Sequence, residues 1–285
     1  MNTVRLPRLA LIAGPTASGK TALALEHAAR EAVTIINADA SQVYRDLRIL
    51  SARPAAEEER QAPHRLFGHR DGAEACNVAA WAADAGQAVV EAWAEGRLPL
   101  LVGGSGLYLR TLLDGIAPVP PIDPAVRAAV RALAAADAHR ALAEEDPPLA
   151  RRLHPNDTTR VQRALEVVRS TGQSMLGWQG QREGGLRGRV ALEVTVTDLP
   201  VDLLYARCDR RCEEMVAAGA VDEVAALLQR ALDPALPVMR AIGVRELAGH
   251  LAAAWPLERA IGAMQQATRN YAKRQRTWFR NQRLI

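Results

Sequence analysis

The sequence is poor in cysteine and in long apolar segments. Its three cysteines, at positions 76, 208 and 212, are odd in number and form no Cys-X-X-Cys pair, which argues against a disulfide framework. Cys208 and Cys212 stand four residues apart on an expected helix, so we predict that they lie in a buried apolar stripe. The first apolar run, residues 8–13, is too short for a signal peptide or a membrane span, and we expect a cytoplasmic protein without membrane contact.

Aromatic residues are also scarce, at 4% of the chain. We therefore interpret Trp81, Trp93 and Trp178 as packing residues and not as platforms on which bases stack. The 285 residues are 49% hydrophobic and 24% charged, which is typical of a globular protein that can bury a sizeable core. A net charge of +4 suits an anionic partner. Nothing in the sequence demands an oligomer, so we expect a monomer.

Apolar runs alternate with helical patterns near the N-terminus. The runs at 8–13, 33–39 and 99–104 predict buried strands, and helices are expected at 21–30 and 78–95. Continuous apolar strands separated by helices are typical of a parallel sheet that is covered on both faces. We therefore predict an α/β fold, with a parallel sheet flanked by helices.

The pattern changes at a proline-rich stretch near residue 117. Two helical patterns follow, at 123–137 and 157–172, and a further strand is expected at 190–197. We predict a mostly helical insertion domain, residues 117–189, within an α/β core domain. That core consists of residues 1–116 and 190–285.

Residues 14–21 read GPTASGKT, a full match to the phosphate-binding pattern G-X-X-X-X-G-K-[ST]. The match lies after an expected strand and at the start of an expected helix, so we predict that the sheet is P-loop NTPase-like and that the core is a P-loop core domain. Its glycines let backbone N–H groups approach phosphate oxygens, and the helix N-terminus attracts negative charge. Lys20 supplies a cation, and the Thr21 hydroxyl can bind Mg²⁺. The pattern predicts phosphate or diphosphate binding but does not say whose phosphates are bound.

A nucleoside-triphosphate hydrolase also needs a carboxylate at the end of an apolar strand. The strand at 99–104 runs into glycine and Ser105 instead, and the strand-end carboxylate of the core is Asp39. Because the carboxyl ends of parallel strands gather beside the P-loop, we expect Asp39 near the bound phosphates. The alternative is that Asp39 caps a helix, and the two roles are compatible. From these residues alone the chain is a P-loop enzyme with a basic surface. A small-molecule kinase and a nucleotide-gated RNA-binding protein both remain open.

Basic residues recur at spacings of four, three and four along the expected final helix, near Pro256 to Phe279, and so share one face. No aspartate or glutamate occurs within 269–285. We therefore predict that this face binds nucleic-acid phosphates. The basic residues are Arg269, Lys273, Arg276 and Arg280.

Six blocks of the sequence, in order, resemble the bacterial tRNA dimethylallyltransferases, also called tRNA isopentenyltransferases. They are GPTASGKT at 14–21, INADASQVYRDL at 36–47, LLVGGSGLYL at 100–109, HPNDTTRVQRALEV at 154–167, MRAIGVRE at 239–246 and TRNYAKRQRTWFR at 268–280. Only the first block is widely shared among other proteins. The resemblance implies transfer of a dimethylallyl group from dimethylallyl diphosphate to N6 of adenosine 37 in the tRNA anticodon loop, with Mg²⁺ as cofactor and release of diphosphate.

The resemblance also implies roles for single residues. The diphosphate loop falls on Gly14, Pro15, Thr16, Ala17, Ser18, Gly19, Lys20 and Thr21. Catalytic roles fall on Asp39, as the general base, and on Thr16 and Lys20. The implied tRNA contacts are Asp39, Ala40, Ser41, Gln42, Ser105, Arg127, Thr159, Arg160, Val161, Gln162, Arg163, Arg240, Ala241, Ile242, Gly243, Val244 and Arg245. Ala40 stands where the family often has serine, and Val244 where tyrosine is common.

The implied reaction makes definite demands on these residues. When adenine N6 attacks C1 of the donor, negative charge builds on the departing diphosphate, so cations and N–H groups must already point there. The amine must also lose a proton, which Asp39 can accept. A stacked adenine must be flipped out of its loop to react. One arginine of the helix at 200–218 is expected to reach the diphosphate, and spacing does not select among Arg207, Arg210 and Arg211.

Overall fold

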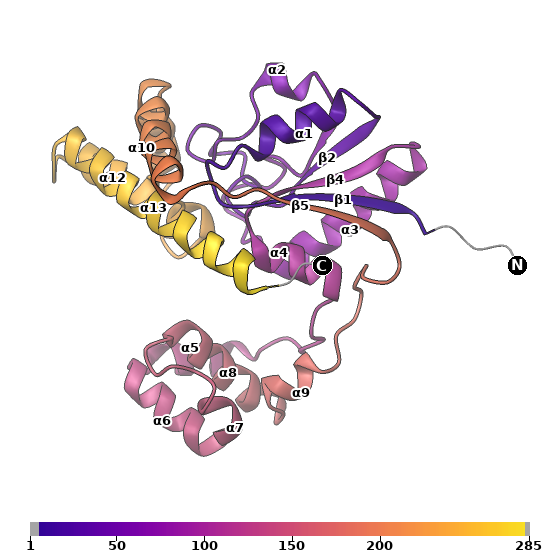
Figure 1. Ribbon diagram of the computed structural model, residues 1–285. Helices are drawn as coiled ribbons and strands as arrows, with labels where there is room; N and C mark the ends of the chain where they lie inside the picture. Colours follow the sequence, from indigo (N-terminus) through magenta and orange to yellow (C-terminus); the bar gives the residue numbers. More distant parts are fainter. Residues whose placement is uncertain (1–5, 283–285) are drawn as a thin grey trace, which may run out of the picture. The chain divides into compact units, whose positions relative to one another are not determined.

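The computed structural model describes residues 6–282, which fold into two units (Figure 1). One unit contains residues 6–113 and 186–282, and we call it the core unit. The other contains residues 114–185, and we call it the helical unit.

A five-stranded parallel sheet forms the centre of the core unit, with the strand order β3-β2-β4-β1-β5. Together with the helices on both faces, it confirms the predicted α/β fold of the P-loop type. The predicted strand at 33–39 ends at Asn37, so Asp39 lies just beyond the sheet. The strands are β1 (Arg8–Ala13), β2 (Val33–Asn37), β3 (His64–Arg65), β4 (Leu98–Gly103) and β5 (Ala191–Val196).

The strands bury side chains on both faces of the sheet. Leu9, Leu11 and Ala13 of β1 join the apolar cluster on the side of α3 and α4, whereas Ala10 and Ile12 join the cluster on the side of α1. Successive side chains of a strand point to opposite faces, which explains this division. In Figure 1, α1 lies on one side of the strands and α3 and α4 on the other. These flanking helices are α1 (Lys20–Ala28), the short α2 (Ala56–Glu59), α3 (Val78–Ala94) and α4 (Gly106–Asp114).

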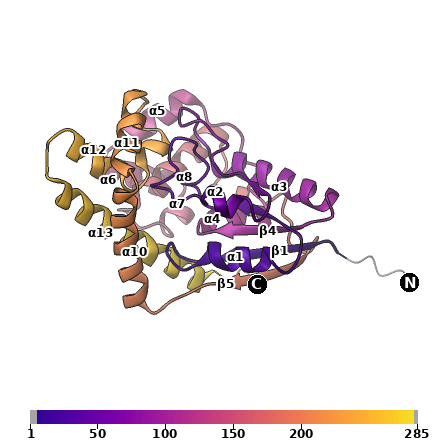
Figure 2. The ribbon, with the colours of Figure 1, turned by 90° about the horizontal axis from the view of Figure 1, so that it is seen from above.

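The C-terminal third of the chain is helical, as predicted. Figure 2 shows α10 beside α13, and these two helices pack along one another. Cys208 and Cys212 of α10 are buried, which confirms the predicted apolar stripe. The elements are α10 (Val201–Ala217), α11 (Ala220–Gln229), the 3₁₀-helix η1 (Pro237–Arg240), α12 (Val244–Leu251) and α13 (Leu257–Asn281).

Five helices form the helical unit around their own apolar core. As predicted, Asp157 caps α8 by accepting a hydrogen bond from Arg160 N, and Gly172 ends it at φ 68°. The prediction of a single helix at 123–137 was wrong. Leu133 is extended, at φ −70° and ψ 140°, and packs against the unit's core, so the pattern divides between α5 and α6. The helices are α5 (Pro124–Ala132), α6 (Ala135–Glu145), α7 (Pro147–Ala150), α8 (Thr158–Thr171) and α9 (Met175–Gln179).

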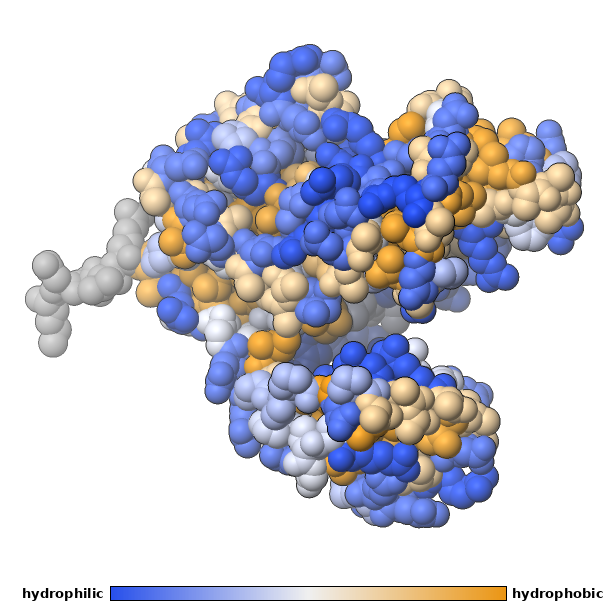
Figure 3. All heavy atoms as spheres, turned by 180° about the vertical axis from the view of Figure 1, so that it is seen from behind, coloured by the Kyte–Doolittle hydropathy of each residue, from blue (hydrophilic) through white to orange (hydrophobic). Residues whose placement is uncertain are grey.

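The surface is mixed in character. Hydrophilic side chains cover much of the face seen in Figure 3, with apolar ones scattered among them. The exposed large apolar residues include Val90 and Leu107, which stand on different helices. Across residues 6–282, the structure contains no helix with the length and apolar character needed to cross a membrane.

Candidate active site

The P-loop begins directly after β1 with Gly14, where the surrounding atoms leave no room for a side chain. Gly14 has φ 153°, and a Cβ there would lie 2.2 Å from Oγ1 of Thr197, just after β5. The Ser18 hydroxyl shares a hydrogen bond of 2.6 Å with the same Thr197 oxygen and donates to Pro15 O at 2.8 Å. The loop is therefore stabilised by the bond from Ser18 to Pro15 and by the contact of Ser18 with Thr197 at the end of β5.

Lys20 begins α1 and folds back over the loop. Its Nζ donates to Gly14 O at 3.0 Å and to Pro15 O at 2.7 Å. Burial lowers the pKa of Lys20 to about 8, and the positive charge of Arg211 adds to this effect while Asp39 opposes it. The ammonium is thus a poorly solvated cation whose hydrogen-bond acceptors are neutral carbonyls, and an anion brought beside it would be attracted strongly.

Asp39 follows β2 and lies on a turn that its own side chain stabilises. Its Oδ1 accepts from Ser41 N at 3.0 Å and from the Ser41 hydroxyl at 2.7 Å. Its backbone N–H donates to Asn37 Oδ1 at 2.8 Å. Residues 38–50 contain no helix, so the alternative that Asp39 caps a helix is wrong. The carboxylate is fixed by local bonds and faces the same cavity as Lys20.

Ser105 follows β4 and supports the turn that carries Asp39. Its hydroxyl accepts from Ala40 N at 2.9 Å, and its backbone N–H donates to Ala38 O at 3.1 Å. It also hydrogen-bonds with the hydroxyl of Tyr271 on α13. The strand beside β1 therefore ends in glycine and a serine engaged with its neighbours, which is not the carboxylate that a triphosphate hydrolase needs.

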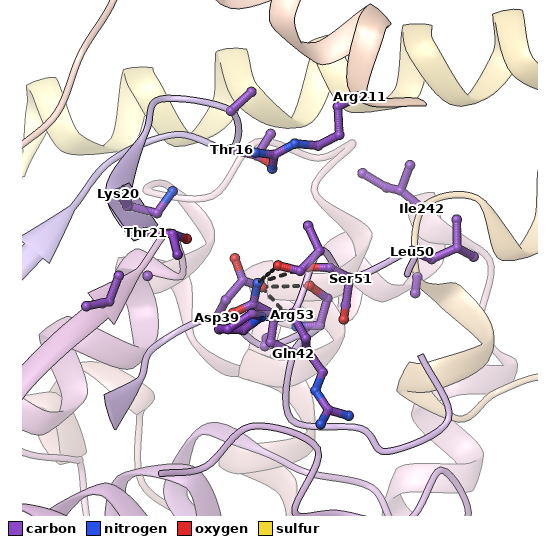
Figure 4. Close-up of a pocket in the computed structure, with 18 of the residues that line it drawn as sticks. Thr16, Lys20, Thr21, Asp39, Gln42, Leu50, Ser51, Arg53, Arg211 and Ile242 are labelled. Atoms are coloured by element: carbon purple, nitrogen blue, oxygen red, sulfur yellow. Dashed lines mark hydrogen bonds between the residues drawn. The ribbon is translucent and has the colours of Figure 1, made fainter. Parts of the chain in front are cut away.

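A cavity of about 760 Å³ in the core unit brings the P-loop and Asp39 together. In Figure 4, Lys20 and Thr21 lie on one side and Asp39, Gln42 and Ser51 stand opposite. The Gln42 side chain donates to the carbonyls of Ser51 and Ala52, both at 2.9 Å, and so holds its own wall of the cavity. The predicted residues on the walls are Thr16, Ala17, Ser18, Gly19, Lys20, Thr21, Asp39, Ala40, Ser41, Gln42, Arg240, Ala241 and Ile242.

Of the three candidate arginines on α10, Arg211 lies on the cavity wall. Its Nη1 donates to the Thr16 hydroxyl at 3.3 Å, as the neighbouring side chains in Figure 4 show. Arg207 approaches the P-loop at Gly19, whereas Arg210 is exposed. Spacing could not separate these residues because the choice depends on how α10 is rotated against α13.

Several predicted tRNA contacts lie away from the cavity. Val244 and Val161 have 2% and 0% of their surface exposed and pack in the apolar cores of their units, so their side chains do not face solvent. Ser105 lies behind the cavity wall, and Gly243 and Arg245 lie at the start of α12. In the helical unit, the other members of the predicted set are Arg127 on α5 and Thr159, Arg160, Gln162 and Arg163 on α8.

Several arginines of the helical unit are paired with acids. The buried carboxylate of Glu166 lies 3.1 Å from Arg131, 3.5 Å from Arg163 and 3.9 Å from Arg127. Arg160 pairs with Asp157. Each of these arginines remains well exposed, so the group can meet an anion from solvent.

The positive charge on the predicted basic face of α13 is partly balanced by acidic side chains from other elements. Arg276 pairs with Asp198 at 2.8 Å, Arg280 reaches the same carboxylate at 3.3 Å, and Arg269 pairs with Asp209. The prediction counted acids only within 269–285, but the fold brings these two from elsewhere in the chain. Lys273 is exposed on the same face.

The opposite face of α13 contains site residues that sequence reasoning missed. Tyr271 and Arg274 line the cavity, with the Arg274 guanidinium 5.8 Å from the centre of the Tyr271 ring. Burial raises the pKa of Tyr271, so its hydroxyl stays protonated at neutral pH. The buried Gln275 contacts the P-loop itself. The available signal was the recurrence of Met264, Thr268, Tyr271 and Gln275 at helical spacing, which marks an inward face with polar members.

The fold and this cavity define a class: a P-loop α/β enzyme that binds a phosphorylated substrate beside a fixed carboxylate. A sequence model described as IPP transferase matches residues 42–282, a part of the chain that begins after the P-loop and Asp39. The chain belongs to this family and is a prenyltransferase, which confirms the resemblance.

Curated relatives and solved structures agree with this assignment. The tRNA dimethylallyltransferase of Sphingopyxis alaskensis is 61% identical over 275 residues, covering 96% of this chain and 90% of the relative. That of Erythrobacter litoralis is 56% identical over 282 residues, covering 97% and 89%. The tRNA isopentenylpyrophosphate transferase of Bacillus halodurans aligns with a TM-score of 0.70 at 34% identity, covering 98% and 88%. A eukaryotic dimethylallyltransferase acting on tRNA aligns with a TM-score of 0.83 at 27% identity, covering 95% and 69%.

Proposed function

We propose that this chain transfers a dimethylallyl group from dimethylallyl diphosphate to N6 of adenosine 37 in the tRNA anticodon loop. The observation that carries the proposal is the shared cavity, in which the P-loop faces the fixed carboxylate of Asp39 in a chain of the IPP transferase family. One wall suits an anionic leaving group, and the other suits an amine that must lose a proton.

The donor binds through its diphosphate. Backbone N–H groups of Ala17–Thr21 meet the phosphate oxygens at the start of α1, where the helix dipole favours negative charge. Lys20 and Arg211 add two cations on the same side. Charge that develops on the departing diphosphate therefore meets donors that are already in place, which is the arrangement that lowers the barrier to bond breaking.

Magnesium fits this wall through one protein ligand and the substrate. Among residues 6–282, no group of three His, Cys, Asp or Glu side chains is placed to hold a metal. Mg²⁺ commonly uses one or two protein oxygens together with substrate phosphates, and the Thr21 hydroxyl on the cavity wall supplies such an oxygen. When bound there, the ion neutralises negative charge on the diphosphate.

Asp39 acts as the general base. The adenine amine attacks C1 of the donor, the bond from C1 to the diphosphate oxygen breaks, and the amine proton passes to the Asp39 carboxylate. The bonds from Ser41 to Oδ1 keep the carboxylate from rotating. A positioned base of this kind contributes a factor on the order of 10²–10⁴ in rate.

The tRNA presents a flipped adenine to the cavity and is held by phosphate contacts around it. Residues 39–42 and 240–242 line the cavity and would lie beside the reacting nucleotide. The exposed arginines of the helical unit, Arg127, Arg160 and Arg163, would contact the RNA backbone by exchanging their carboxylate partners for phosphates.

The test is direct turnover. Purified protein is incubated with dimethylallyl diphosphate, Mg²⁺ and unmodified tRNA, and nucleosides are analysed by mass spectrometry for N6-dimethylallyladenosine. We expect product with the wild type and a loss of roughly 10²–10⁴-fold in Asp39→Ala. Undiminished product in Asp39→Ala would remove Asp39 from its role. No product from folded wild-type protein across a full tRNA pool would overturn the proposed function.

A further inference from the structure

Gln275 is a polar residue buried in a largely apolar face of α13. Its residue surface is 5% exposed, and its neighbours on that face include Met264, Thr268 and Ala272, all buried. A buried amide is stable only if both its donor and its acceptor are satisfied. Sequence patterning gives no reason for an amide at this position, so its partners indicate what it does.

The two ends of the amide bind two different loops. Gln275 Oε1 accepts from Thr16 N at 2.8 Å, and Gln275 Nε2 donates to Gly104 O at 2.9 Å. Thr16 belongs to the P-loop, and Gly104 belongs to the turn after β4. The side chain of the final helix therefore bridges the carboxyl ends of two neighbouring strands.

The turn after β4 is shaped to admit this side chain. A Cβ on Gly104 would lie 2.1 Å from Gln275 Nε2, so only glycine leaves space for the amide. The next residue, Ser105, accepts from Ala40 N at 2.9 Å and thereby supports the turn of Asp39. A chain of three hydrogen-bonded contacts thus runs from the P-loop through Gln275 to the segment that carries Asp39.

The bridge also determines which P-loop groups are available to a ligand. The Thr16 N–H is occupied by Gln275, and the Thr16 hydroxyl accepts from Arg211. Thr16 is consequently held at both its backbone and its side chain, while Ser18 N–H donates to Pro15 O at 3.4 Å within the loop. The position of the loop relative to Asp39 is set by contacts that do not involve the ligand.

We infer that Gln275 is a positioning residue that keeps the diphosphate loop in register with the turn of Asp39. This inference rests on the proposed function, because the register matters only if the donor carbon and the accepting amine must meet between these two walls. Gln275 does not touch the reacting atoms. It acts through Thr16 on one side and through Gly104 and Ser105 on the other.

Two substitutions and a matched control test the bridge. Gln275→Met keeps the length of the side chain but removes both hydrogen bonds. Gln275→Glu keeps the shape and can still accept from Thr16 N, but its ionised form cannot donate to Gly104 O. Gln266→Met is the control, because it makes the same glutamine-to-methionine substitution at an exposed position of the same helix. Turnover is measured with dimethylallyl diphosphate and tRNA, and amide hydrogen exchange is followed in the peptide that contains residues 14–21.

We expect Gln275→Met to lower kcat by about 10- to 100-fold, because a small misplacement of reacting groups is costly, while KM for tRNA changes little. Exchange in the P-loop peptide should accelerate. Gln266→Met should match the wild type in both measurements. A kcat equal to that of the control, or a rise in the KM for tRNA that accounts for the whole loss, would overturn the inference.

The glutamate variant gives a readout that general damage to the fold would not produce. As the pH is lowered from about 8 to about 6, the buried carboxyl protonates and can donate to Gly104 O, so kcat relative to the wild type should rise. A ratio that stays flat would count against the bridge. If the wild type itself forms no product, the proposed function fails, and hydrogen exchange still decides whether Gln275 holds the loop.

Discussion

The core unit and the helical unit use positive charge in opposite ways. In the core cavity, Lys20 donates to backbone carbonyls and Arg211 to a hydroxyl, so their charges are not cancelled by these bonds. In the helical unit, three arginines surround the buried carboxylate of Glu166. A cation with neutral partners is prepared for an anionic ligand and loses little when the ligand arrives, whereas a paired cation must first give up its acid. The core is therefore suited to tight binding of a small anion, and the helical unit to exchangeable contacts with a polyanion.

Among the changes that compare the charges of the two units, removing a cation from the cavity should have the largest effect. Arg211→Ala is expected to reduce kcat/KM for the donor by on the order of 10²–10³, because the charge acts on the developing diphosphate in a confined site. Steady-state kinetics with varied dimethylallyl diphosphate would measure this. Arg210→Ala, one residue away and exposed, is the control and should remain near the wild type. An equal loss of kcat/KM in the two variants would show that the position of Arg211 on the cavity wall gives it no special role.

The pH dependence of donor binding should follow Lys20. Since burial lowers its pKa to about 8, the free enzyme holds the protonated amine below that pH and must take up a proton to bind the anion above it. Affinity for dimethylallyl diphosphate should therefore be fully present below pH 8 and fall by up to about tenfold per pH unit as the pH rises further. Calorimetric titrations at several pH values would show it. Lys20→Arg, which does not titrate in this range, should bind with a flat profile, and a parallel fall in that variant would exclude Lys20 as the cause.

A smaller effect, on stability, is expected from replacing the buried carboxylate of Glu166 in the helical unit. Glu166→Gln leaves a buried amide among three arginines and should destabilise that unit by roughly 1–2 kcal/mol, most of which is the lost charge-assisted hydrogen bonding of a buried group. Hydrogen exchange along α8 would report it, and donor binding in the core should not change. Glu144→Gln, on an exposed position of α6, is the matched control. Weakened donor binding in Glu166→Gln would show that the two units do not act separately.

Local patterns predicted most of the fold. The P-loop, the strands at 8–13 and 99–104 and the N-cap of α8 depend on apolar runs and cap residues close together in sequence. The structure confirms them with boundaries shifted by at most one residue. The two-residue strand β3 was missed because a strand of that length produces no periodic pattern. The break at Leu133 was missed because helix propensity is high on both sides of it.

The site was less accessible to sequence reasoning wherever it depends on distant contacts. Placement of Asp39 beside the P-loop followed from the rule for parallel strand ends. The choice of Arg211 over Arg210, and the pairing of Arg276 with Asp198, depend on how α10 and α13 pack, which no local pattern encodes. Gln275 was missed for the same reason, since its partners lie 171 and 259 residues away.

The bond between Thr16 and Gln275 also has a consequence for biosynthesis. The first functional loop of the chain is completed by a residue of its last helix, across 259 positions. A ribosome adds roughly 5–20 residues per second, so the loop emerges many seconds before its partner exists. Contacts of such long sequence separation form late and slow the folding of a domain. The nascent protein therefore exposes a phosphate-binding sequence that gains this support only after α13 has been synthesised, and a chain truncated before α13 would lack it.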